Sequence, residues 1–253
     1  MLYDSHANYD DRQFDADRYE IIMQAHNQGV SFINNIASDI KSSKKSIELA
    51  EKFDFVYATV GVHPSDVHGM TNADIDTLRK LAQHKKVVAI GEIGLDYHYD
   101  DASEEEQKLW FPPQLELSNE LNLPVVIHDR ESRGDCIRIL KEHKISNGVV
   151  HCFSGSAETA KELLKMGLHI SFTGVVTFKN ARKAIEALKV VPMDRLMIET
   201  DCPYMAPEPY RGKRNYSGYV IKVAEKIAEV KGMTVEDVAE QTTKTAKTLF
   251  GIS

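Results

Sequence analysis

Short apolar runs alternate with longer amphipathic stretches from one end of the chain to the other. The apolar runs are nearly continuous, which is typical of strands that are covered on both faces. They predict strands at residues 2–6, 30–36, 56–62, 87–92, 124–128, 148–152, 168–173 and 196–200. The stretches between and after them predict helices at residues 15–28, 40–52, 71–83, 104–121, 132–143, 157–166, 179–189, 218–231 and 235–249. Alternating strands and helices predict a parallel sheet built from βαβ units.

Two architectures fit this pattern, a (β/α)8 TIM barrel and an open doubly wound sheet. The open sheet predicts a glycine-rich turn after the first strand, but residues 6–10 contain no glycine. The 253 residues match the roughly 250 that one barrel domain needs. No Ser/Gly tract or long charge run marks a linker. We therefore predict an α/β chain that forms a single (β/α)8 barrel domain over residues 1–253.

Six of the predicted strands end on, or just before, a side chain that can bind a metal ion. These side chains are His6, His63, Glu92, His128, His151 and Asp201. In a barrel, the carboxyl ends of the strands meet at the face that holds the active site. Taken singly, a histidine would more often be a hydrogen-bonded core residue, and for Glu92 the alternative is an ion pair with a neighbouring cation. Their recurrence at equivalent positions favours a catalytic centre for divalent metal ions.

Closure of the barrel would bring some of these residues side by side. Strand eight then adjoins strand one, which brings Asp201 beside His6. Glu92 would bridge two ions, because a bridging carboxylate is what a two-metal hydrolase needs. The predicted metal ligands are His6, Asn8, Glu92, His128, His151 and Asp201. Glu92 and Asp201 are also the predicted catalytic residues, and His63 is predicted either to contact substrate or to be a capping or core histidine.

Charge restricts the class of substrate. The net charge of -7 argues against a general binder of polyanions. Local positive charge nevertheless follows two strand ends: Arg130 after strand five, and Arg211, Lys213 and Arg214 after strand eight. Barrel enzymes often bind phosphate near their last strands, and a guanidinium group can hold phosphate with two hydrogen bonds. We predict that these four residues contact a phosphate-bearing substrate, with a solvated basic loop as the alternative.

Cysteine usage and hydropathy indicate the compartment. The three cysteines form no close-spaced pair, which fits a reducing environment. Charged residues from Asp4 onward argue against a secretory signal peptide. No apolar run approaches the roughly 20 residues that span a bilayer. We expect a cytoplasmic monomer without a membrane partner.

Eight short motifs occur in order along the whole chain. They are Asp4-Ser5-His6, Gly61-Val62-His63-Pro64, Gly91-Glu92-Ile93-Gly94-Leu95-Asp96, Phe111-Pro112-Pro113-Gln114-Leu115, Leu123-Pro124-Val125-Val126-Ile127-His128, His151-Cys152-Phe153-Ser154-Gly155, Glu199-Thr200-Asp201-Cys202-Pro203-Tyr204 and Arg211-Gly212-Lys213-Arg214-Asn215. Together they resemble the TatD family of metal-dependent deoxyribonucleases, within the amidohydrolase-like barrels. Any one motif is weak, but the ordered set is specific.

The resemblance implies a (β/α)8 barrel that hydrolyses DNA phosphodiester bonds from a 3′ end, with one or two divalent ions. Mg²⁺ is the ion that the resemblance favours, and Mn²⁺ and Zn²⁺ are the alternatives. The family's ligands fall on His6, Glu92, His128, His151 and Asp201 of this chain. Family members also place the arginine-rich loop and the His63 region near substrate.

The chain departs from the family pattern at two places. The usual His-x-His of the first strand reads His6-Ala7-Asn8 here. An Asn oxygen suits a hard ion such as Mg²⁺ better than a zinc-like ion. The Arg-Asn-Glu-Pro loop of the family reads Arg214-Asn215-Tyr216-Ser217, so a carboxylate is missing. Neither change affects Glu92 or Asp201, and we expect the site to remain competent.

Two other functions fit the same residues. The same kind of site could cleave an ester, amide or lactone bond, including the aminoacyl ester of a charged RNA, and fold alone does not decide. A protein that binds nucleic acid and has lost its metal-dependent activity is the alternative from another class, because Asn8 replaces a ligand. The basic loops favour a phosphate-bearing substrate, and we predict a deoxyribonuclease.

Overall fold

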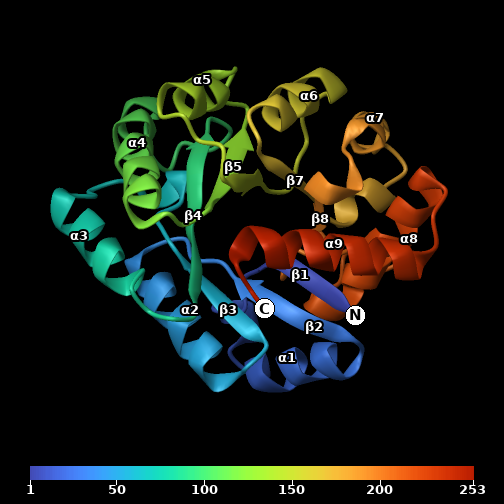
Figure 1. Cartoon of the computed structure of the whole chain (residues 1–253). Coiled ribbons are helices and arrows are strands. Elements are labelled where there is room, and N and C mark those ends of the chain that lie inside the picture. Colours follow the sequence, from blue (N-terminus) through green and yellow to red (C-terminus); the bar gives the residue numbers. More distant parts are fainter. The chain divides into compact units, whose positions relative to one another are not determined.

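The computed structural model describes residues 1–253 and contains eight strands that alternate with helices (Figure 1). The strands are β1 (Leu2–Ala7), β2 (Val30–Asn35), β3 (Val56–Val60), β4 (Val87–Asp96), β5 (Val125–Arg130), β6 (Gly148–Val150), β7 (His169–Phe172) and β8 (Leu196–Ile198). The α-helices are α1 (Arg18–Asn27), α2 (Ile40–Lys52), α3 (Asn72–Leu81), α4 (Glu104–Leu121), α5 (Asp135–Glu142), α6 (Ala157–Lys165), α7 (Arg182–Val190), α8 (Val220–Lys231) and α9 (Val235–Phe250). No helix is both long enough and apolar enough to cross a membrane.

The sheet follows the chain, with strands in the order β1 to β8. The pairs β1–β2, β3–β4, β4–β5, β5–β6 and β7–β8 are parallel. A parallel bridge between Ala7 and Cys202 joins β1 to the segment that follows β8. The predicted alternation of parallel strands and helices is therefore confirmed. Several predicted boundaries differ from the structure by one to three residues, and the largest difference is in the fourth strand, which continues past residue 92 to Asp96.

Internal contacts divide the chain into two compact units. Unit 1 comprises Met1–Asn35, Cys152–Lys165 and His169–Ser253, and unit 2 comprises Ile36–His151 and Met166–Leu168. In unit 1, helix α9 packs against β1 and β8. Figure 1 shows this C-terminal helix in red beside the blue first strand. The organisation as a single domain stays a prediction.

Buried apolar side chains form the core of each unit. In unit 1 the largest fully buried side chains include Tyr3, Phe14 and Phe172, and in unit 2 they include Ile90 and Phe111. Burial of such side chains contributes about 1.5–3 kcal/mol each. Strand β1 is buried along its whole length, although it carries Asp4, Ser5 and His6. Polar side chains at such positions need specific partners, because an unsatisfied buried polar group is costly.

A glycine sets the spacing of β4 and β5 beside the candidate site. Gly94 pairs with His128 in the ladder and has φ 149°. A Cβ atom at this position would lie 1.9 Å from the carbonyl oxygen of His128. Only glycine permits both this backbone conformation and this close approach. Gly94 therefore fixes how closely the strands that carry Glu92 and His128 approach.

Candidate metal centre

Unit 2 gathers three imidazoles around one carboxylate. The Oε1 atom of Glu92, on β4, lies 2.7 Å from Nδ1 of His128 and 2.7 Å from Nε2 of His151. Nε2 of His63 lies 3.6 Å from the same oxygen. The Nδ1 atom of His128 and the Nε2 atom of His151 are 3.2 Å apart. These residues, which we call the Glu92 cluster, come from the ends of β3, β5 and β6 and from the middle of β4.

Asp96 holds the imidazole of His128 from the other side. Its Oδ2 atom lies 2.8 Å from Nε2 of His128, and its Oδ1 atom accepts a hydrogen bond of 2.9 Å from the backbone N–H of His98. Burial alone would lower the pKa of His128, but the hydrogen bonds to Asp96 and Glu92 outweigh it and raise the pKa. A histidine that donates one N–H to a carboxylate presents its other nitrogen as a ligand.

The surroundings of His63 settle its tautomer. Its Nδ1 atom accepts a hydrogen bond of 3.1 Å from the backbone N–H of Ser65. Burial lowers the pKa of His63 to about 3, so the ring is neutral at pH 7. A neutral imidazole has one N–H, and with Nδ1 as acceptor this proton sits on Nε2. His63 therefore points a donor, not a lone pair, toward Glu92, which suits contact with substrate better than ligation.

The Glu92 cluster fits a divalent cation. His128 lies between Glu92 and Asp96, at 2.7 Å and 2.8 Å. If the proton of His128 sits on Nε2 and is donated in a hydrogen bond to Asp96, Nδ1 carries a lone pair. That lone pair faces Oε1 of Glu92 and Nε2 of His151. A positive charge at this point, either a proton on His128 or a metal ion, would be stabilised by the two carboxylates that flank His128. Imidazole nitrogens with one carboxylate oxygen are donors that borderline ions such as Zn²⁺ prefer.

Unit 1 holds the other predicted ligands at the junction of β1 and the segment after β8. Nε2 of His6 lies 3.5 Å from Oδ1 of Asp201, and the backbone N–H of Asp201 donates to the carbonyl of His6 at 2.8 Å. The side-chain Nδ2 of Asn8 donates to Oδ1 of Asp201 at 3.0 Å and to the carbonyl of Cys202 at 3.2 Å. Because both partners are acceptors, the amide nitrogen of Asn8 must face them. Asn8 is therefore the hydrogen-bond donor in this arrangement, and it orients the carboxylate of Asp201.

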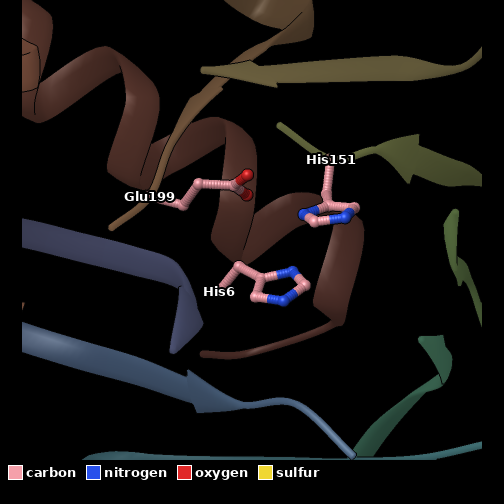
Figure 2. A group of neighbouring side chains, drawn as sticks. All are labelled: His6, His151 and Glu199. Atoms are coloured by element: carbon pink, nitrogen blue, oxygen red, sulfur yellow. The ribbon is translucent and has the colours of Figure 1, made fainter. Parts of the chain in front are cut away.

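Glu199, which lies two residues before Asp201, was not predicted as a site residue. Figure 2 shows its carboxylate and the ring of His6, and their ligand atoms lie within 4.8 Å of one another. The carboxylate accepts hydrogen bonds from the backbone N–H of Cys152 at 2.6 Å and from the hydroxyls of Ser171 and Ser5. These three donors compensate the burial of its charge. His151, also drawn in Figure 2, belongs to the Glu92 cluster.

Asp4 ties the first strand to the segment after β8 beneath His6. Its carboxylate accepts from the backbone N–H and the hydroxyl of Thr200 at 2.8 Å and 2.6 Å. Burial raises the pKa of Asp4 to about 7, and the charge of Glu199 acts in the same direction. Asp4 and Thr200 therefore position the backbone that carries His6 and Asp201.

The predicted substrate-binding cations have different environments. Arg214 donates to the carboxylate of Asp17 at 2.5 Å and 2.9 Å and to the carbonyl of Gln13 at 2.6 Å, so it is engaged within the protein. Arg211 lies over the ring of Phe178, and Lys213 over that of Tyr210. In unit 2, Arg130 lies over the ring of Tyr99, with 4.8 Å from Cζ to the ring centroid. Arg130, Arg211 and Lys213 remain candidates for substrate contact.

Sequence reasoning missed Asp96 and Glu199 as supporting residues. Asp96 stands four residues after Glu92 on the same strand, so both side chains share a face. That spacing could have identified Asp96, had the strand been extended to include it. Glu199 stands at the same two-residue spacing from Asp201, in a segment that we assigned to the strand end.

Comparisons with known proteins agree with this geometry. The model of the family described as TatD related DNase matches residues 3–251. The chain is 47% identical to the uncharacterized metal-dependent hydrolase YabD of Bacillus subtilis, with 100% of both chains covered. It is 34% identical to the 3′-5′ ssDNA/RNA exonuclease TatD of Pantoea ananatis, over 99% of this chain and 100% of that protein.

A solved structure shows the same fold. The TatD homologue YJJV of Escherichia coli superposes with a TM-score of 0.93 at 29% identity, over 100% of this chain and 98% of that one. The predicted fold class, a (β/α)8 barrel of parallel strands, is therefore confirmed. This chain belongs to the TatD family of metal-dependent hydrolases.

Proposed function

We propose that the protein is a metal-dependent phosphodiesterase that removes nucleotides from the 3′ end of single-stranded DNA. The observation that carries this proposal is the convergence of His128 and His151 on one oxygen of Glu92, with His128 held by Asp96. The name of the Pantoea ananatis relative, a 3′-5′ ssDNA/RNA exonuclease, supports the choice of substrate. RNA is the second substrate that this name suggests.

We assign catalytic roles to the Glu92 cluster and to the pair His6–Asp201. This assignment rests on the family's fold, in which the carboxyl ends of the strands carry the active site. The residues that would hold one or two divalent ions are His6, Glu92, His128, His151 and Asp201. Asn8, whose amide donates to Asp201, would support that carboxylate, although its oxygen stays a candidate ligand.

A bound divalent ion would polarise a phosphoryl oxygen and supply a water of lowered pKa for the attack. Because three of the five proposed ligands are imidazoles, we propose Zn²⁺ ahead of the Mg²⁺ that the resemblance favours, with Mn²⁺ as the alternative. Mg²⁺ prefers a site of oxygen ligands. The Glu92 cluster offers one carboxylate oxygen together with the imidazole nitrogens of His128 and His151.

The chain's own residues divide the remaining work. Asp201 is 15% exposed at its side chain, which leaves its carboxylate able to accept a proton from the attacking water. His63 carries its proton on Nε2 and can donate it in a hydrogen bond to a phosphoryl oxygen. Asp96 fixes the tautomer of His128. Arg130, Arg211 and Lys213 supply positive charge for the phosphates that flank the cut.

The test is hydrolysis of a single-stranded DNA oligonucleotide in Mn²⁺, Zn²⁺, Mg²⁺ or EDTA. We expect metal-dependent shortening from the 3′ end, lost on EDTA addition and in the Glu92→Gln and Asp201→Asn variants. Asp194→Asn is the matched control, because Asp194 is exposed at the amino end of β8, away from the site-bearing end. Cleavage that survives Glu92→Gln would refute the assignment of the centre.

An ester, amide or lactone hydrolase on the same barrel remains the second candidate. Hydrolysis of model esters by the metal-loaded protein, with no cleavage of DNA or RNA, would replace our proposal with this one. Stoichiometric metal binding without turnover of any substrate would instead indicate a binding protein that has lost its catalytic activity.

A further inference from the structure

Tyr99 is an exposed aromatic residue in the loop that follows β4. Its side chain is 51% exposed, whereas Tyr97, two residues earlier, donates its hydroxyl to Asp135 at 2.9 Å. The loop is nevertheless held in place. The backbone N–H of His98 donates to Asp96, and its Nδ1 lies 3.0 Å from Oε1 of Glu131. The ring of His98 packs edge-on against Tyr99, with 4.8 Å between centroids.

Arg130 brings a cation to the same ring. It is the last residue of β5 and follows His128 by two positions, so both side chains project from one face of the strand. Asp96 and Arg130 are partners in the ladder, and Tyr97 N–H donates to the carbonyl of Arg130 at 3.0 Å. The guanidinium lies 4.8 Å from the centroid of Tyr99. Other arginines of the unit are paired with carboxylates, as Arg133 is with Glu104.

We propose that Tyr99 and Arg130 form a stacking platform for a nucleobase of a single-stranded substrate, beside the Glu92 cluster. This inference rests on the proposed function. Base stacking on an aromatic ring tolerates every base, because every base has a π-face, and a neighbouring arginine adds charge for the backbone. The platform would seat the 3′-terminal base and present the adjoining phosphodiester to the metal centre. The protein would then trim single strands without strong sequence preference.

Asp96 connects the loop that carries Tyr99 to the Glu92 cluster. Asp96 contacts His128 at 2.8 Å on one side and His98 at 2.9 Å on the other. The segment that holds Tyr99 is thus tied to the residue that orients a proposed ligand. Substrate seated on Tyr99 is therefore held by the same rigid segment as the centre, which favours precise placement of the scissile bond.

The experiment compares two oligothymidylates in the presence of Mn²⁺. One is intact and the other lacks the 3′-terminal base but keeps every phosphate. Both carry a phosphorothioate at the last linkage to resist hydrolysis, and a fluorescent label at the 5′ end. Binding is measured by anisotropy for the wild type and for Tyr99→Ala, Tyr99→Phe and Arg130→Gln. Tyr19→Ala is the matched control, because Tyr19 is 46% exposed on α1.

We expect the wild type and Tyr99→Phe to bind the intact oligonucleotide about tenfold more tightly than the abasic one. Tyr99→Ala should lose this preference by weakening only the binding of the intact form. Arg130→Gln should weaken both forms together, with a shallower salt dependence. The Tyr19 variant should match the wild type. Circular dichroism would show that the exposed substitutions leave the fold intact.

Several results would overturn the platform. They are a wild type without base preference, a Tyr99→Ala variant that keeps the preference, and equal weakening of both forms by Tyr99→Ala. Cleavage of the corresponding unmodified oligonucleotides separates this inference from the proposed function. Metal-dependent cleavage with no base preference would contradict the platform alone. A base preference that depends on Tyr99, without cleavage under any metal, would contradict the nuclease and leave the platform standing.

Discussion

Replacing Asp96 with Asn tests how the imidazole of His128 is held. Asp96 is 1% exposed, and both of its oxygens accept hydrogen bonds, one from His98 N–H and one from His128. An Asn side chain has one acceptor oxygen and one donor nitrogen. The variant must therefore turn its NH2 group toward one of these two partners. Either a donor faces the backbone N–H of His98, or the proton of His128 moves from Nε2 to Nδ1.

The second arrangement damages the metal site directly. A proton on Nδ1 of His128 would occupy the atom that faces Glu92 at 2.7 Å and His151 at 3.2 Å. Metal binding would then have to restore the other tautomer. Loss of such a supporting carboxylate costs about 10- to 100-fold in metal affinity or activity. A tenfold change corresponds to about 1.4 kcal/mol, which is within the roughly 1–3 kcal/mol cost of an unsatisfied buried polar group.

The measurement is titration calorimetry of the metal-free protein with Mn²⁺, together with kcat/KM on single-stranded DNA. The matched control is Asp129→Asn. Asp129 is the neighbour of His128 on β5, and its side chain projects from the opposite face and bonds to Ser132. The reasoning fails if Asp96→Asn binds Mn²⁺ and turns over DNA like the wild type. It also fails if Asp129→Asn loses as much affinity as Asp96→Asn.

Three further predictions concern other parts of the centre and its loop. Because the pKa of His63 is lowered to about 3 from its ordinary 6.5, only the unfolded chain takes up this proton between those values. The metal-free wild type should therefore lose stability relative to His63→Gln by about 1.4 kcal/mol per pH unit as the pH falls below 6.5, measured by urea unfolding of both proteins. Arg214→Ala should lower the free energy of unfolding by about 1 kcal/mol and leave KM unchanged. The part of this loss that comes from the ion pair should disappear in acid, because the pKa of Asp17 is lowered by Arg214 and the pair contributes only while Asp17 is charged. A raised KM would show that Arg214 contacts substrate after all. Asn8→His should tighten Zn²⁺ binding more than Mg²⁺ binding in competition titrations, whereas weaker binding of both would show that the amide donated to Asp201 matters more.

The pattern of the chain was sufficient for the order of elements and for the residues at the strand ends. Near-continuous apolar runs identify buried parallel strands, and each run ends where the chain leaves the core. His128 and Glu92 could be found in this way, because each closes an apolar run of the sequence and a polar side chain at such a position needs a partner. The end of β4 was misplaced because the apolar run was taken to end at Glu92, although the strand continues through Gly94 to Asp96.

The partner of each polar side chain was decided by the tertiary structure alone. Sequence periodicity tells which face of a strand a residue shares, but not which atom of a neighbouring strand it meets. Tertiary packing places the carboxylate of Asp96 against His128, the amide of Asn8 against Asp201, and the guanidinium of Arg214 against Asp17. These contacts join segments far apart in the chain. The sequence by itself thus determined the fold class and the candidate ligands, whereas packing in three dimensions decided tautomers, donors and acceptors.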